Sequence, residues 1–192
     1  ITTQFGPFIG QVEYQTSEGL KQVSYWAAKA IDVKAFNANS EVDQVKWVEI
    51  SEVKQILSMD SDKEILKKFT KLNLDTTPLI LLRHAKALKR VEWIGDDGDR
   101  PLDNRGQIQS EKFRSIYEAY EIDEIFSSDA YRCLETVKPL GRDLGLTVGI
   151  ASDISEYQYS RDKEKPLKFA KKFLKASKDS ETPKTVLLCS HN

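Results

Sequence analysis

Apolar strand-like runs separated by helical segments constrain the fold of this chain more than any other feature. Residues 79–82 are all leucine or isoleucine, as expected of a strand buried on both faces of a parallel sheet. Residues 122–126 and 185–189 form further short strands, and 102–120 and 128–144 have helical spacing, with Gly145 as a stop signal. Alternation of strands and helices predicts an α/β fold with a parallel, doubly wound sheet.

The residues before this alternation follow a different order. Residues 8–15 and 23–31 read as a β-hairpin across the turn signal 16–19, and 45–50 as a third strand. Ser51 is expected to start a short helix to Met59, and Ser61 with Glu64 forms a capping box that opens a second helix. This is α+β order, too small to be a complete domain. We therefore predict a boundary near residue 75, which gives segments 1–75 and 76–192.

Arginine is distributed unevenly along the chain. None occurs before Asp75, and all of them follow it: Arg83, Arg90, Arg100, Arg105, Arg114, Arg132, Arg142 and Arg161. Both histidines, His84 and His191, also lie in the second segment. The planar, fork-shaped guanidinium group suits phosphate, whereas lysine alone would have provided solubility. The second segment is therefore the predicted site of phosphate chemistry.

Composition excludes several classes of function. The net charge of the 192 residues is −1, without the basic excess of a nucleic-acid binder. No apolar run approaches the roughly 20 residues that span a bilayer, and no signal peptide is visible. Cys133 and Cys189 lack metal-type spacing and are expected to be reduced thiols beside the site, in a cytoplasmic protein. The lysine-rich stretch 160–184 reads as an amphipathic helix.

Each histidine follows directly after an apolar strand, where sites form in open α/β sheets. If these strands are neighbours, His84 and His191 reach one crevice. Arg132 lies near the first turn of a helix, where free amides favour an anion. A neutral imidazole attacks phosphorus in line, while arginines and a second histidine stabilise the equatorial oxygens. The pattern predicts a phosphoryl-transfer site with His84 as the nucleophile.

Several motifs in this order resemble the histidine phosphatase superfamily, whose fold is phosphoglycerate mutase-like. The similarity covers about residues 78–192 and begins with Arg83-His84-Ala85, where Ala85 replaces the usual glycine. Residues 127–136, 154–156 and 189–191 resemble the later motifs. The resemblance implies a phosphohistidine at His84, a phosphate pocket of Arg83, Arg132 and His191, and Glu156 as the general acid. It further implies that Arg100 lines the pocket mouth and that Ser128 contacts the substrate.

Residues 21–30 and 41–48 resemble the back half of a Nudix domain, the part that follows its catalytic box. The combination with a short phosphatase segment is similar to the actinobacterial two-domain MutT proteins. Those proteins sanitise oxidised guanine nucleoside triphosphates or cleave diadenosine polyphosphates. The resemblance implies a hydrolase of nucleotides that combines Nudix-type cleavage with a phosphohistidine-forming domain.

The Nudix box itself is missing from these residues. Its glutamates hold divalent metal, so Mg²⁺ is expected only for a complete Nudix domain, and the phosphatase segment needs no cofactor or metal. We therefore expect an interior piece of a longer protein, truncated after the second histidine. In that protein Glu41 would approach the nucleotide or metal, although a surface carboxylate that flanks a strand is the more common explanation.

Three hypotheses follow from the sequence. The first is a Nudix–histidine phosphatase enzyme for nucleotide polyphosphates. The second is a stand-alone phosphatase for small phosphoesters or phosphohistidine proteins. The third is a non-catalytic phosphatase-like docking domain. The expected partners are a nucleotide or another small phosphorylated substrate, with neither nucleic acid nor membrane, and a homo-oligomer built on contacts between Nudix-like and phosphatase-like segments.

Overall fold

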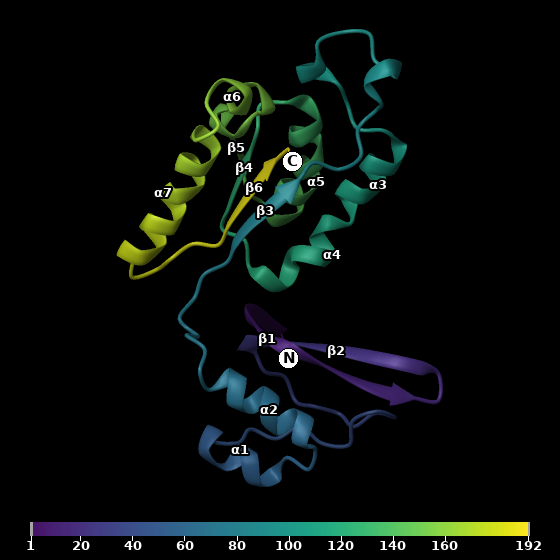
Figure 1. Cartoon of the computed structure of the whole chain (residues 1–192), viewed down its shortest axis with the longest axis vertical. Coiled ribbons are helices and arrows are strands. Elements are labelled where there is room, and N and C mark those ends of the chain that lie inside the picture. The colour runs from purple at the N-terminus through teal and green to yellow at the C-terminus, as the bar shows by residue number, and fades with distance from the viewer. Residues whose placement is uncertain (1, 192) are drawn as a thin grey trace. The chain divides into compact units, whose positions relative to one another are not determined.

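A computed structural model describes residues 2–191 of the chain (Figure 1). The chain divides into two compact units, and the boundary along the sequence lies between Thr76 and Thr77. Within residues 2–191, every helix is too short or too polar to cross a lipid bilayer.

The first unit is built on a β-hairpin. Strands β1 (Thr2–Thr16) and β2 (Gly19–Asp32) pair antiparallel, with Thr16 opposite Gly19, so the predicted hairpin is confirmed. Two helices follow, α1 (Ile50–Ile56) and α2 (Asp60–Phe69), and α2 lies against β1. Ile65 of α2 is buried, whereas large apolar side chains such as Trp26 and Trp47 remain exposed.

Several local predictions for this unit are wrong. Residues 45–49 form no strand, because a strand needs a neighbour for its backbone hydrogen bonds and the sheet of residues 2–76 contains β1 and β2 alone. Helix α1 begins at Ile50, so Ser51 does not cap it. Helix α2 begins at Asp60 with no side-chain cap, which places Ser61 inside the first turn and rules out the capping box with Glu64.

The second unit is a four-stranded parallel sheet in the order β3-β6-β4-β5. This arrangement confirms the predicted α/β class. The strand bounds are β3 (Leu79–Arg83), β4 (Glu124–Ser127), β5 (Val148–Ile150) and β6 (Val186–Ser190). Strand β5 was not predicted, because three residues that include Gly149 carry no recognisable apolar period.

Helices cover both faces of this sheet because the side chains of β6 alternate between them (Figure 1). Leu187 and Cys189 pack with α5 (Tyr131–Leu144) and with residues of α4 (Phe113–Tyr117). Val186 and Leu188 face the opposite layer, where aromatic residues of α7 (Lys165–Asp179) pack. The predicted amphipathic helix in 160–184 is thus present as α7.

Strand β3 is not buried on both faces, contrary to expectation. It lies at the edge of the sheet, and Leu81 is 72% exposed because the layer formed with α7 reaches Leu79 but not Leu81. The predicted helix over 102–120 is interrupted at Lys112 and consists of α3 (Asn104–Glu111), α4 and the short 3₁₀ helix η3 (Glu118–Tyr120).

Helix α5 begins at Tyr131 and not at Ser128. Its N-cap is Ala130 and no side chain caps it, so the prediction that Ser128 caps this helix is wrong. The stop at Gly145 is confirmed, since this residue has φ 69°, a left-handed conformation that favours glycine. The remaining short helices are η1 (Arg90–Glu92), η2 (Asp97–Asp99), η4 (Ser152–Ile154) and α6 (Glu156–Arg161).

Candidate active site

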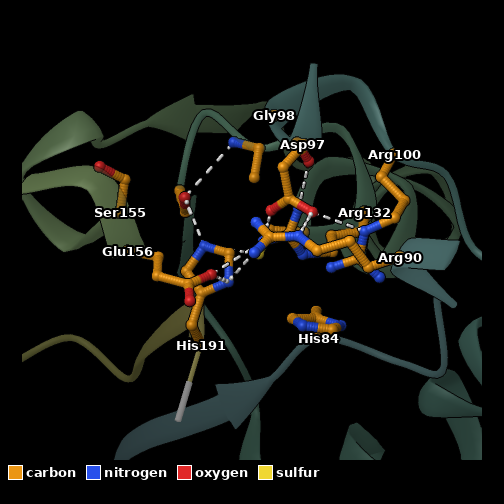
Figure 2. A network of polar contacts seen from close by, with 12 residues as sticks. His84, Arg90, Asp97, Gly98, Arg100, Arg132, Ser155, Glu156 and His191 are labelled. Atoms are coloured by element: carbon orange, nitrogen blue, oxygen red, sulfur yellow. Dashed lines mark hydrogen bonds and ion pairs between the residues drawn. The ribbon is translucent and has the colours of Figure 1, made fainter. Parts of the chain in front are cut away.

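The two histidines meet because their strands are neighbours in the sheet. Arg83 pairs with Ser190 across β3 and β6, and the backbone N–H of His84 continues this ladder by donating to the carbonyl of Ser190 at 2.9 Å. The rings of His84 and His191 are 5.4 Å apart between centroids (Figure 2). The carboxyl edge of the sheet therefore delivers both imidazoles to one place, as the sequence predicts.

The ring of His84 is oriented by a backbone contact. Its Nδ1 lies 2.7 Å from the carbonyl oxygen of Ala85, which can only accept, so Nδ1 carries the proton. Burial lowers the pKa of His84, and the positive charge of Arg132 adds to this effect, while the hydrogen bond to Ala85 opposes it. A neutral ring therefore keeps a free electron pair on Nε2, the form that a nucleophile requires.

The backbone beside His84 is fixed by Thr136 of α5. The N–H of Ala85 donates to Thr136 Oγ1 at 2.9 Å, and that hydroxyl donates to the carbonyl of Arg132 at 2.6 Å. Thr136 is fully buried. One side chain thus links the residue after His84 to the first turn of α5, which carries Arg132.

His191 bridges the arginine and a buried hydroxyl. Arg132 Nη2 lies 3.3 Å from Nδ1 of His191, so Nδ1 accepts this hydrogen bond, and Nε2 lies 3.1 Å from Ser128 Oγ. Cys133 Sγ is 3.6 Å from the same Nε2. Cys133 and Cys189 are buried and free, in agreement with the expectation of reduced thiols beside the site. Ser128 thus contacts His191 and does not line the cleft described below.

Arg132 is the most deeply buried charge of the site, with its side chain 2% exposed. Its Nη1 donates to the main-chain carbonyl of Asp97 at 2.6 Å. Its Nη2 lies 3.1 Å from Glu156 Oε2 and 3.2 Å from Asp97 Oδ2. Its Nε is buried without a hydrogen-bond partner among residues 2–191. Because a buried cation needs paired partners, these contacts hold the guanidinium group in place.

Asp97 also contacts the arginines of the site, although the motifs of the sequence do not point to it. Its Oδ1 accepts from Arg100 Nε at 2.8 Å and from Arg90 Nε at 3.1 Å, so one carboxylate bridges Arg90, Arg100 and Arg132 (Figure 2). Burial alone would raise the pKa of Asp97, but the hydrogen bonds from Arg100 and Arg90 and the charge of Arg132 lower it to about 2. The one signal in the sequence is its position in an acidic turn between arginines, which Asp96 and Asp99 share.

His84 opens into a cleft of about 690 Å³. Glu156 is the one carboxyl group among the described residues that line it, and its side chain is 63% exposed. The cationic lining residues are Arg83, Lys86, Lys89, Arg100 and Arg132. A nucleophilic nitrogen in a cation-rich cleft suits attack on a phosphoryl group, whose charge these side chains can neutralise.

The cleft brings together most of the residues selected from the sequence. Those that line it are Arg83, His84, Arg100, Arg132, Glu156 and His191. Glu41 lies in the first unit, where its backbone N–H donates to Asn39 Oδ1 at 2.9 Å and its side chain is exposed. Among residues 2–191 there is no group of three or more His, Cys, Asp or Glu side chains arranged to hold a metal ion.

Comparison with known proteins gives both sequence and structural relatives. The chain is 32% identical over 161 residues to the 8-oxo-(d)GTP phosphatase of Mycolicibacterium smegmatis. The matched stretch covers 84% of this chain and 50% of that protein. The chain thus spans about half the length of this curated relative.

Solved structures with a similar fold include the protein histidine phosphatase SixA complexed with tungstate, with 20% identity and a TM-score of 0.46 over 58% of this chain and 67% of that one. A mycobacterial glucosyl-3-phosphoglycerate phosphatase has 16% identity and a TM-score of 0.48 over 60% of this chain and 75% of that one.

The family model that matches the chain covers residues 79–183, more than half of its length. The match includes strand β3, which ends directly before His84, the helix that carries Arg132 and the segment of Glu156, and His191 lies just beyond it. Together with the placement of these side chains around one cleft, it shows that the chain belongs to branch 1 of the histidine phosphatase superfamily.

Proposed function

We propose that this phosphatase works through a phosphohistidine on His84 and acts on small phosphorylated compounds, nucleotides first among them. The observation that supports the proposal most is the orientation of His84. Its Nδ1 proton is held by the Ala85 carbonyl, so the free electron pair of Nε2 is left for attack on a phosphoryl group in a cleft rich in cations.

The reaction divides into two displacements at phosphorus. In the first, Nε2 of His84 forms a bond to phosphorus, the bond to the leaving oxygen breaks, and its electron pair takes a proton from protonated Glu156. In the second, water loses a proton to the Glu156 carboxylate and attacks phosphorus, and the P–N bond breaks to return the electron pair to Nε2. Arg132 and Arg100 stabilise the charge on the phosphoryl oxygens in both steps.

Nucleotides are proposed as substrates because of the sequence relative. Its name is 8-oxo-(d)GTP phosphatase, and the 161 matched residues are more than the second unit holds, so the match takes in part of the first unit as well. We infer that the first unit is part of a Nudix domain of a longer, cytoplasmic protein. In that protein a complete Nudix domain would cleave oxidised guanine nucleoside triphosphates or dinucleoside polyphosphates with Mg²⁺. We also propose that the protein forms a homo-oligomer.

Trapping the phosphoryl group on the protein tests the mechanism. The chain is mixed with substrate that carries ³²P in its terminal phosphate and quenched within milliseconds in alkali, and the labelled peptide is identified. We expect acid-labile, alkali-stable phosphate on His84 and none in the His84→Ala variant. Label on another residue would refute the mechanism. If the His84→Ala variant releases phosphate as fast as the wild type, the second unit is not the phosphatase, and the hypothesis of a non-catalytic docking domain is supported.

A further inference from the structure

We propose that Asp97 is the positioning residue of this active site, which sets the guanidinium groups of Arg100 and Arg132 for the phosphoryl group. The inference rests on the proposed phosphatase function and assigns a role to a residue that the two-step reaction does not use. Asp97 lies in η2, outside the strand ends and outside the helix that carries Arg132.

Asp97 contacts Arg132 with both its main chain and its side chain. Nη1 of Arg132 donates to the Asp97 carbonyl at 2.6 Å, and Nη2 lies 3.2 Å from Oδ2 of the carboxylate. Two contacts on different nitrogens fix the rotation of a planar guanidinium group as well as its position. The Nε–H of Arg132 stays buried without a partner among the described residues, so the contacts with Asp97 act on the two outer nitrogens of the group.

The same carboxylate fixes Arg100 through its other oxygen. Arg100 Nε donates to Oδ1 at 2.8 Å, while its Nη1 donates to the carbonyl of Leu88 at 2.5 Å. The side chain of Arg100 is 16% exposed and lines the cleft. Arg90, whose side chain is 74% exposed, is the outermost of the arginines that Asp97 binds.

The charge of Asp97 makes this cluster of arginines stable without substrate. Like charges that lie within a few ångströms of one another repel, and burial strengthens the repulsion. An ionised carboxylate between Arg90, Arg100 and Arg132 removes this cost. Because its pKa is lowered to about 2, Asp97 holds no proton near neutral pH, so it positions the arginines and does not act as the general acid.

Turnover and anion affinity respond differently if Asp97 positions the arginines. In Asp97→Asn the arginines keep their charge but lose their fixed orientation. We expect kcat for p-nitrophenyl phosphate to fall about 10- to 100-fold, since small misplacements of catalytic groups have effects of this size. Inhibition by orthophosphate should be as strong as in the wild type or stronger, because a negative charge has been removed from an anion site.

Asp97→Glu serves as the conservative variant and Asp99→Asn as the matched control. Glutamate retains the charge and should recover part of the lost kcat. Asp99 lies in the same turn, is exposed and makes no side-chain hydrogen bond or ion pair within residues 2–191, so its variant should behave as wild type. Thermal unfolding of each variant, with and without orthophosphate, shows whether the cleft still forms.

Three results would overturn the inference. One is kcat within about twofold of wild type in both Asp97 variants. Another is a parallel loss of turnover and of orthophosphate binding in Asp97→Glu, which would show that Asp97 only supports the structure. The third is a wild-type chain without turnover, which would remove the proposed function together with the inference. An active wild type with unaffected Asp97 variants would remove the inference alone.

Discussion

At the scale of single residues, the chemistry depends on which ring nitrogen of each histidine carries the proton. The Ala85 carbonyl places the proton of His84 on Nδ1, and Arg132 requires an electron pair on Nδ1 of His191. The two rings thus carry their protons on opposite nitrogens. His84 offers Nε2 as a nucleophile, whereas His191 directs its Nε2–H toward Ser128.

The lowered pKa of His84 gives a first prediction. Desolvation disfavours the imidazolium form, so His84 should titrate below 6.5, the usual value for histidine. The unfolded chain then binds more protons at this residue, and the unfolding free energy contributed by His84 should decrease as the pH falls below 6.5. The measurement is NMR titration of the histidine Cε1–H signals.

Assignment of this titration is simple because the chain has 2 histidines. His84→Ala removes one signal and identifies the other as His191. A midpoint of His84 at or above 6.5 would contradict the role given to desolvation.

Thr136 gives a second prediction at this scale. Thr136→Val leaves the buried N–H of Ala85 without its acceptor, which should lower the unfolding free energy by about 1–3 kcal/mol. It also releases the backbone beside His84, so kcat should fall as well. Urea unfolding and steady-state turnover measure the two effects. Thr147→Val, at an exposed position of the same unit, should change stability by less than about 0.5 kcal/mol.

At the scale of elements, the sequence predicts the second unit better than the first. Its long apolar runs and amphipathic helices indicate β3, β6, α5 and α7 correctly, because each buries apolar side chains in one of the two layers that cover the sheet. Strand β5 has too few residues to show a period, and the expected strand at 45–50 follows local propensity in a segment without a pairing partner. Pairing is a tertiary property that a single short window does not contain.

Gly106 of α3 gives the prediction at this scale. A Cβ atom at this position would lie 2.0 Å from the backbone carbonyl oxygen of Lys86. Although alanine favours helices over glycine by about 1 kcal/mol, Gly106→Ala should destabilise the unit and displace the segment after His84. We expect a lower melting temperature and a lower kcat.

The control for this variant is Gln107→Ala, at an exposed position of the same helix. It should match the wild type in both measurements. A Gly106→Ala variant that is more stable than the wild type would show that α3 shifts away from Lys86 without cost.

At the scale of the whole molecule, the candidate site combines elements that are far apart in sequence. His84, Arg132 and His191 can be selected from the sequence because strand ends and helix starts meet at one edge of a parallel sheet. Asp97 cannot, because the turn that holds it follows no periodic pattern and its partners become neighbours only in the folded chain. The family resemblance identified the same histidines and arginines but not this carboxylate.

The charge distribution of the cleft gives the prediction for the whole molecule. Arginine and lysine side chains line the cleft beside His84 and can provide the positive charge that a divalent cation provides in other phosphate sites. The rate of phosphate release by this chain should therefore be the same in excess EDTA as in the presence of added Mg²⁺. Loss of activity that Mg²⁺ restores would contradict this mechanism. We expect magnesium-dependent cleavage only where a complete Nudix domain is present.

The position of β6 in the sheet has a consequence for biosynthesis. This strand lies between β3 and β4, yet it is the last of the four to leave the ribosome. Until it is inserted, β3 and β4 have no common neighbour, and His191 is not beside His84. If His84 is the nucleophile as proposed, we expect a nascent chain to gain phosphatase activity only after β6 has filled the middle of the sheet.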